Sequence, residues 1–199
     1  MKRQIAGVLC AAMLTGIFSG CGKQETSVKN FTAPESGEDI VCIQVENYGE
    51  IKIKLFSDLM PKACENFTGL AESGYYNELT FHRVIPNFMI QGGDPKGNGT
   101  GGESIWGGKF DGGSDALCHV RGAVAYANSG SYTADGSQFY IVTGGPVDEE
   151  TLDSYEKNGY GPYTKEQREL YTTIGGTPWL DGSYTVFGQV IEGLDIAIQ

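Results

Sequence analysis

One charged side chain stands out because it lies inside an apolar stretch. Arg83 belongs to residues 81–91 (FHRVIPNFMIQ). Strand parity predicts that Arg83, Met89 and Gln91 share one face, with Pro86 interrupting the regular pleat. A guanidinium among apolar side chains is costly unless it is paired or functional. Arg83 is therefore a candidate fixed hydrogen-bond donor in a site, and a structural arginine satisfied by carbonyls or a carboxylate is the alternative.

Motifs for other kinds of chemistry are absent or lack their context. Residues 97–102 (GNGTGG) satisfy G-x-G-x-x-G, but the sequence that follows is not helical, as a dinucleotide site requires. Gly108-Lys109 lacks the flanking residues of a phosphate-binding loop. There is no G-x-S-x-G motif, and His82 and His119 lack the spacing of zinc ligands. We therefore expect no cofactor and no metal.

Several blocks occur in one order along the chain. They are residues 81–94 (FHRVIPNFMIQGGD), 99–102 (GTGG), 121–128 (RGAVAYAN), 136–141 (GSQFYI) and 179–182 (WLDG), followed by 186–188 (VFG). In this order they resemble the cyclophilin-type peptidyl-prolyl cis-trans isomerases, over roughly residues 40–199 apart from 146–176. The resemblance implies a mainly β fold, a cyclophilin-like eight-stranded antiparallel barrel with flanking helices. It also implies catalysed rotation about X-Pro peptide bonds.

The chemistry of prolyl isomerisation suits an arginine. Rotation breaks amide resonance, whose barrier is about 18–20 kcal/mol, and in the twisted state the prolyl nitrogen regains its lone pair. A donor aimed at that nitrogen stabilises the transition state more than either ground state. The resemblance implies that Arg83 is this donor and that Gln91, the second catalytic residue, binds the substrate backbone.

The resemblance also implies a groove around the proline. An apolar cup would hold the ring, formed by Phe88, Met89, Tyr140 and Leu180. Asn128 would pair its main chain with the peptide. The rest of the groove would consist of Gly99, Ala127, Gln138, Trp179 and Tyr184. The family commonly has Phe, His and Ala where this chain has Tyr140, Tyr184 and Ser129. These differences bear on the preference for the residue before proline and on the binding of cyclosporin, a candidate further ligand.

Hydrophobic periodicity predicts the elements that position these residues. Residues 40–45 and 51–55 flank a turn and predict a hairpin. Pro61 opens a helix with an apolar stripe that ends near Gly74. Residues 146–176 predict an insertion of two short helices, the second beginning with a capping box at 164–167. Strand character returns at 184–190.

The last residues predict the start of another helix after Gly193. By resemblance, the family closes its barrel with a second helix and a last strand. We therefore expect this chain to be truncated before both.

The N-terminus predicts export. Two basic residues precede an uncharged, mostly apolar run of 14 residues from Ile5 to Phe18, and two small residues then precede Cys21. This pattern resembles a bacterial lipoprotein signal. We expect residues 1–20 to be the signal peptide, Cys21 to be lipidated and residues 21–39 to be a flexible tether. An ordinary secretory signal, with Cys21 incidental, is the alternative.

Charge and cysteine content narrow the partners. The formal net charge is −11, which argues against binding to nucleic acid. An acidic surface is also repelled by anionic lipids, so a lipid anchor at Cys21, not the protein surface, would hold the chain at a membrane. Apolar residues flank Cys42, Cys64 and Cys118 in the sequence, so we expect these three cysteines to be small buried side chains.

Together these features predict a monomeric, extracytoplasmic, lipid-anchored enzyme. It would isomerise X-Pro bonds of exported proteins at the membrane surface. Two alternatives stay open: a non-catalytic chaperone that binds proline-containing peptides, and a surface lipoprotein that uses residues 146–176 as its contact site. A lid that packs on the barrel is the other interpretation of residues 146–176.

Overall fold

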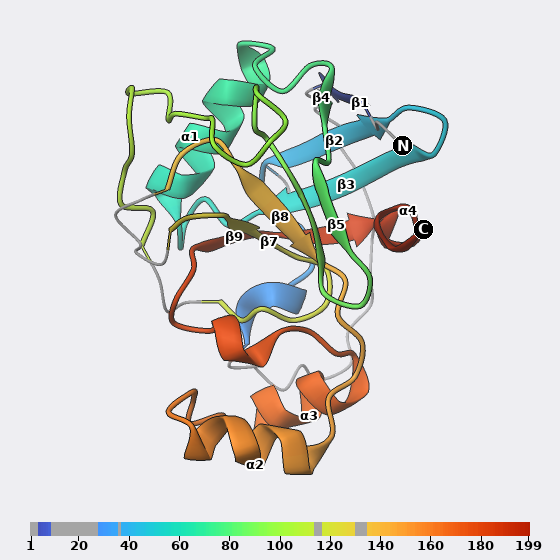
Figure 1. Cartoon of the computed structure of the whole chain (residues 1–199), viewed down its shortest axis with the longest axis vertical. Coiled ribbons are helices and arrows are strands. Elements are labelled where there is room, and N and C mark those ends of the chain that lie inside the picture. Colours follow the sequence, from blue (N-terminus) through green and yellow to red (C-terminus); the bar gives the residue numbers. More distant parts are fainter. Residues whose placement is uncertain (1–3, 9–27, 36, 114–116, 130–134) are drawn as a thin grey trace.

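One antiparallel sheet organises the part of the chain that the computed structural model describes, residues 4–8, 28–35, 37–113, 117–129 and 135–199 (Figure 1). Its strands are β1 (Gln4–Val8), β2 (Ile40–Val45), β3 (Gly49–Leu55), β4 (Leu79–Thr80), β5 (Arg83–Ile85), β6 (Met89–Gly92), β7 (Ala123–Tyr126), β8 (Phe139–Val142) and β9 (Val186–Glu192). Their order across the sheet is β4-β1-β2-β3-β9-β7-β8-β6-β5. The mainly β fold class is confirmed.

The strand count differs from the eight that the family resemblance implies. The described residues give nine strands in a single sheet. One of them, β1, lies within the segment expected to be a signal peptide and pairs with β2 and β4. The lipidation site Cys21 lies outside the described residues.

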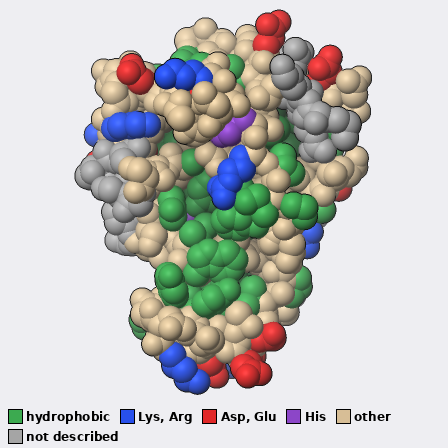
Figure 2. Space-filling model, in the orientation of Figure 1, with side chains coloured by type: hydrophobic (Ala, Val, Ile, Leu, Met, Phe, Trp, Pro, Cys, Tyr) green, Lys and Arg blue, Asp and Glu red, His purple; other side chains and the backbone are tan. Residues whose placement is uncertain are grey.

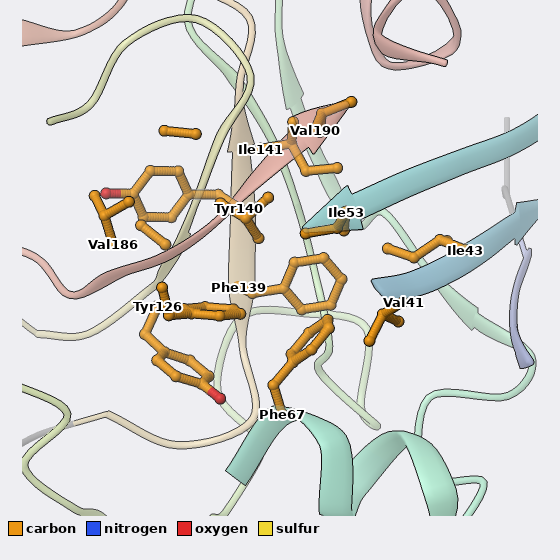
Figure 3. Close-up of a cluster of buried hydrophobic side chains, with 14 of the residues drawn as sticks. Val41, Ile43, Ile53, Phe67, Tyr126, Phe139, Tyr140, Ile141, Val186 and Val190 are labelled. Atoms are coloured by element: carbon orange, nitrogen blue, oxygen red, sulfur yellow. The ribbon is translucent and has the colours of Figure 1, made fainter. Parts of the chain in front are cut away.

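The predicted hairpin and first helix form, and together they build the main core. β2 and β3 pair from Ile40 opposite Lys54 to Val45 opposite Gly49. Helix α1 (Pro61–Glu72) lays its apolar stripe on the sheet. Phe67 of that stripe lies 5.2 Å from Phe139 between ring centroids, nearly edge to face (Figure 3). Such contacts fix α1 against the face of the sheet opposite the one described below as the candidate site.

The predicted insertion forms two helices at one end of the molecule, α2 (Glu149–Lys157) and α3 (Lys165–Thr173) (Figure 1). The predicted capping box is present, with reciprocal bonds between Thr164 and Gln167. The helices cover a second cluster of buried side chains, separate from the main core and made of Val28, Cys118, Val120, Leu152, Tyr163 and Tyr171. We call this set the insertion core.

A buried polar network joins the insertion to the chain that follows it. The short 3-10 helix η3 (Pro178–Leu180) leads to Asp181, whose Oδ1 accepts the backbone N–H of His119 at 2.7 Å and lies 2.9 Å from His119 Nδ1. The Tyr171 hydroxyl donates to Asp181 Oδ2 at 2.6 Å. Helix α3, which carries Tyr171, is thus tied to the segment that enters β7. At the end of the sequence, α4 (Leu194–Ile198) begins after Gly193, as predicted.

Part of the segment expected to be a flexible tether is packed on the domain. We call the described residues 28–35 and 37–39 the strap; it contains the 3-10 helix η1 (Lys29–Phe31). Asn30 is buried and exchanges two hydrogen bonds with the backbone of Cys118, at 2.9 and 3.0 Å. Lys54 is 2% exposed and pairs with Glu38 at 2.8 Å. Buried polar groups need partners, and the strap supplies them.

The three cysteines outside the N-terminal segment are buried and form no disulfide among the described residues, as their apolar neighbours predict. Burial raises the pKa of both Cys64 and Cys118 to about 12, so these thiols stay protonated at neutral pH. The helices of the described residues include none that is long and apolar enough to cross a membrane.

Candidate active site

A row of side chains crosses four strands on one face of the sheet. Arg83 on β5 pairs with Gln91 on β6, Gln91 pairs with Tyr140 on β8, and Tyr140 pairs with Ala125 on β7. Directly paired residues of antiparallel strands project to the same face. Met89 stands two residues from Gln91 and joins this face, as the strand parity predicts. Backbone register alone therefore gathers the candidate donor and the candidate pocket.

A chain of amide groups orients Arg83. Its Nη1 donates to Gln91 Oε1 at 3.3 Å, and Gln91 Nε2 donates to Gln138 Oε1 at 2.9 Å. Gln138 in turn donates to the carbonyl oxygens of Gly101 at 2.7 Å and Gly99 at 3.1 Å. Because carbonyls can only accept, they fix which way each amide faces. The bond to Gln91 is the only hydrogen bond that the Arg83 guanidinium makes within the described ranges. The guanidinium is exposed and has five N–H donors.

The glycine-rich loop that ends this chain is held by Asp94. This carboxylate is 1% exposed and accepts the backbone N–H groups of Lys96 at 2.9 Å, Asn98 at 3.0 Å and Gly99 at 2.6 Å. Burial alone would raise the pKa of Asp94, but the backbone bonds outweigh it and hold the pKa below its usual range. A Cβ at Gly101 would stand 2.2 Å from Asp94 Oδ1, so only glycine fits there.

Apolar and aromatic side chains form a cup beside Arg83. Met89 and Tyr140 are buried, while Phe88 and Leu180 are half-buried and pack on the main core. The guanidinium carbon of Arg83 lies 6.0 Å from the centroid of the Phe88 ring. These are the four residues that the resemblance assigns to the proline ring. Phe88 and Leu180 keep part of their apolar surface exposed, while Met89 and Tyr140 lie almost entirely below the surface.

Tyr140 sits among other rings at the base of the cup. Its ring lies 6.1 Å from that of His119, nearly parallel, and 6.0 Å from that of Tyr184, nearly perpendicular. Burial raises the pKa of Tyr140 well above its usual range, so the phenol stays neutral. Its hydroxyl has no hydrogen-bond partner among the described residues. The extra oxygen thus lies deep in the site and changes its polarity relative to Phe.

The other flank of the site depends on a buried carboxylate. Ala127 continues the pairing of β7 with β8, since its N–H donates to the carbonyl of Gln138 at 2.9 Å. Asn128 Nδ2 donates to Asp135 Oδ1 at 2.9 Å, and the Thr185 hydroxyl donates to Asp135 Oδ2 at 2.6 Å. Burial raises the pKa of Asp135 to about 6, against the lowering effect of Thr185 and Asn128.

Trp179 closes the remaining side. Its ring stacks on Phe88 with 5.8 Å between centroids and 29° between planes. Figure 2 shows a continuous hydrophobic patch on this face, which reaches from the middle of the molecule toward the end where α2 and α3 lie. No three His, Cys, Asp or Glu side chains meet as a metal cluster would in the part of the chain that the structure describes.

The sequence and the structure agree on where the candidate residues lie, while their roles stay predictions. Arg83, Gln91, Gln138 and Gly99 form one hydrogen-bonded chain, and the cup residues adjoin it. Sequence reasoning did not assign Asp94 or Asp135. Asp94 stands at the end of a quoted block, and this position was the available signal. Nothing local marks Asp135, because its partners Asn128 and Thr185 lie on other strands or loops.

Comparisons with known proteins point in one direction. Residues 40–199 match the family model described as cyclophilin type peptidyl-prolyl cis-trans isomerase/CLD. A Staphylococcus saprophyticus protein, named as a candidate peptidyl-prolyl cis-trans isomerase, is 47% identical over 162 residues, which cover 80% of each chain. A similarly named Staphylococcus haemolyticus protein is 48% identical over 149 residues, 74% of this chain and 73% of that one.

Solved structures agree. A crystal structure of a Cryptosporidium parvum cyclophilin type peptidyl-prolyl cis-trans isomerase matches with a TM-score of 0.58 and 34% sequence identity, covering 77% of this chain and 80% of that one. A second crystal structure of that protein, obtained in the presence of the dipeptide Ala-Pro, matches with the same TM-score.

Proposed function

The chain belongs to the cyclophilin-type peptidyl-prolyl cis-trans isomerases, and from this premise we propose that Arg83 is the group that drives the rotation. The observation that carries the proposal is the chain of amides from Arg83 through Gln91 and Gln138 to the glycine loop. It holds a permanently protonated donor at the rim of an apolar cup.

The proposed mechanism is electrostatic and needs no covalent step. The proline ring enters the cup of Phe88, Met89, Tyr140 and Leu180, and the preceding peptide group turns above it. As the amide twists, its nitrogen becomes pyramidal and basic, and an N–H of Arg83 donates to the new lone pair. Because planar ground states lack that lone pair, the bond forms fully only in the transition state.

Gln91 and Asn128 have separate roles in this proposal. The amide oxygen of Gln91 accepts a hydrogen bond from Arg83. The part of the Gln91 amide that faces the substrate stays available to bind the substrate backbone. Asn128, held by the buried Asp135, offers its main chain to the peptide on the other flank. Groups held in place before substrate arrives cost no reorganisation at the moment of reaction.

The decisive experiment is prolyl exchange in a short X-Pro peptide, measured by NMR exchange spectroscopy with the full chain in detergent. Arg83→Ala lowers kcat/KM by about 10²–10³, because a donor of this kind is worth about 3–4 kcal/mol. Arg83→Lys keeps the charge without the planar fork and gives an intermediate rate.

Arg168→Ala is the matched control, because the ion pairs of Arg168 with Glu149 and Glu156 lie within the insertion. It keeps the wild-type rate. A rate unchanged in Arg83→Ala would sink the donor role. Peptide binding by the folded wild type, with no acceleration of exchange, would favour the non-catalytic chaperone.

We also propose that the enzyme acts on exported proteins from a lipid anchor at Cys21. The apolar run before Cys21 and the two small residues next to it support this. Two acyl chains give stable attachment where one does not. Mass spectrometry of the N-terminal peptide from cell membranes tests the anchor. We expect a diacylglyceryl Cys21 in the wild type, with Cys21→Ser found in the soluble fraction; unmodified Cys21 at the membrane would refute it.

A further inference from the structure

A row of aromatic rings leaves the candidate site and crosses onto the insertion. Phe88 stacks on Trp179 at 5.8 Å, Trp179 contacts Tyr155 at 5.4 Å, and Tyr155 meets Tyr160 edge to face at 6.0 Å, all between ring centroids. The first two rings belong to the candidate site described above. The last two belong to α2 and to the turn that follows it. We call these four residues the ring row.

The ring row is solvent-accessible and firmly supported. Phe88, Trp179 and Tyr155 are half-buried, and Tyr160 is 44% exposed. Tyr155 packs on the insertion core, which fixes one side of its ring. The hydrophobic patch in Figure 2 runs in the same direction, from the middle of the molecule toward α2 and α3. Exposed apolar surface that continues a binding groove is more than the scattered single residues of an ordinary surface.

We propose that the insertion lengthens the substrate groove, and that the ring row binds an aromatic or large apolar side chain of the client polypeptide near its proline. This rests on the proposed isomerase function, which places the proline beside Phe88. The three ring contacts carry the row at most about 17 Å from Phe88 to Tyr160, which an extended peptide covers in about five residues. The preferred side chain therefore lies within about five residues of the proline.

Charge favours a polypeptide over a lipid surface as the occupant. Helix α2 has the sequence EETLDSYEK, with four acidic side chains and one basic side chain. Arg168 of α3 pairs with three of the acidic ones, and the surface keeps a net negative charge. Anionic headgroups would be repelled there. A peptide that is bound at the prolyl site is already held close to the rings. Its neighbouring residues can therefore bind the rings without a second loss of translational and rotational freedom.

The test compares three peptides of equal length with one central X-Pro bond. One has Phe four residues after proline, one has Phe four residues before it, and one has Gly at both places. Binding by NMR titration and exchange by exchange spectroscopy are measured separately on the full chain. We expect one Phe peptide to bind about three- to tenfold tighter than the Gly peptide, the range of an aromatic contact.

Variants locate the effect. Tyr160→Ala changes an exposed ring and should preserve the fold, while reducing the Phe preference. Tyr155→Ala should abolish it, and Tyr155→Phe should retain it because the ring stays. Tyr48→Ala, at the turn between β2 and β3, is the matched control and leaves the preference intact. All four accelerate exchange in a short X-Pro peptide as the wild type does.

The outcomes separate this inference from the proposed function. Equal affinity for the Phe and Gly peptides, or a preference that survives both Tyr155→Ala and Tyr160→Ala, would overturn the ring row even if exchange is catalysed. A ring-dependent preference without catalysed exchange would instead overturn the isomerase and leave the ring row as a binding surface for proline-containing peptides.

Discussion

The sheet face that carries Arg83 and the helical insertion hold their side chains in different ways. On the sheet, backbone pairing places Arg83 beside Gln91 and Gln91 beside Tyr140. The polar chain begins at the exposed Arg83 and runs inward through the half-buried Gln91 to the buried Gln138. In the insertion, side chains do the positioning: Leu152 and Tyr171 are fully buried, and Tyr171 reaches Asp181 through its hydroxyl.

This difference separates chemistry from stability. Removing an exposed group from the sheet face leaves the strand pairing intact, so the loss should appear in the rate. Removing a buried group from the insertion leaves a cavity or an unpaired polar atom, so the loss should appear in the free energy of unfolding. Three predictions test how far the separation goes, beginning with the largest effect.

The insertion core is the place for the largest change in stability. Leu152→Ala deletes buried carbons from a residue that is 0% exposed, and should lower the free energy of unfolding by about 2–5 kcal/mol. Urea unfolding measures it. Exchange in a short X-Pro peptide should stay within about twofold of wild type, because the polar chain at Arg83 is untouched.

Leu59→Ala, at a side chain that is 42% exposed, is the control and should be nearly neutral. If the rate with the short peptide falls in step with stability in Leu152→Ala, the two regions are coupled and the separation is wrong.

Asp135 is the exception on the sheet side, because it places a buried charge beneath Asn128. Its pKa of about 6, against an ordinary value of 3.8, means that the folded chain holds the proton more tightly than the unfolded chain. The contribution of this group to stability is therefore greatest below pH 4 and falls as the pH rises to about 6, by about 2–3 kcal/mol.

Asp135→Asn cannot ionise, so its unfolding free energy relative to wild type should rise by that amount between pH 4 and pH 7. Urea titrations at the two pH values measure the difference. Asp58→Asn, at an exposed position, is the matched control. The same pH-dependent gain in both variants would show that the effect does not come from the buried site.

The smallest effect belongs to the orientation of Arg83. Gln91→Met keeps the length of the side chain and removes both of its hydrogen bonds, to Arg83 and to Gln138. We expect kcat/KM for a short peptide to fall about tenfold, equivalent to about 1.4 kcal/mol, and the free energy of unfolding to fall by about 1 kcal/mol because the amide oxygen of Gln138 loses its donor. Gln44→Met, on an exposed position of β2, is the control. If Gln91→Met lowered the free energy of unfolding but left kcat/KM unchanged, the sheet face would behave as we predict for the insertion, and the separation of chemistry from stability would be wrong.

Local pattern was enough to predict the elements whose cause is local. The hairpin at β2 and β3 follows from alternation, α1 follows from the spacing of its apolar residues after Pro61, and α3 begins at a capping box that needs only residues 164–167. Likewise, strand parity placed Arg83, Met89 and Gln91 on one face. In each case the determining contacts lie within a few residues of one another.

The contacts that sequence reasoning missed join distant segments. The strap reads as polar linker because its contacts, from Asn30 to Cys118 and from Glu38 to Lys54, are single polar pairs without periodicity. The link between Asp135 and Asn128 and the contact between the rings of Tyr155 and Trp179 depend on how loops return to the sheet. Such pairs become visible only when the fold is known.

Because the strap is packed on the domain, a chain anchored at Cys21 would have a shorter tether. With all of residues 21–39 free, the domain could stand up to about 65 Å from its lipid. Val28 and Asn30 are buried in the domain. Residues 21–27 are then all that could separate the domain from a lipid on Cys21, and seven residues span at most about 25 Å. The volume open to a domain anchored in this way would be smaller by more than about tenfold, because volume scales with the cube of the reach.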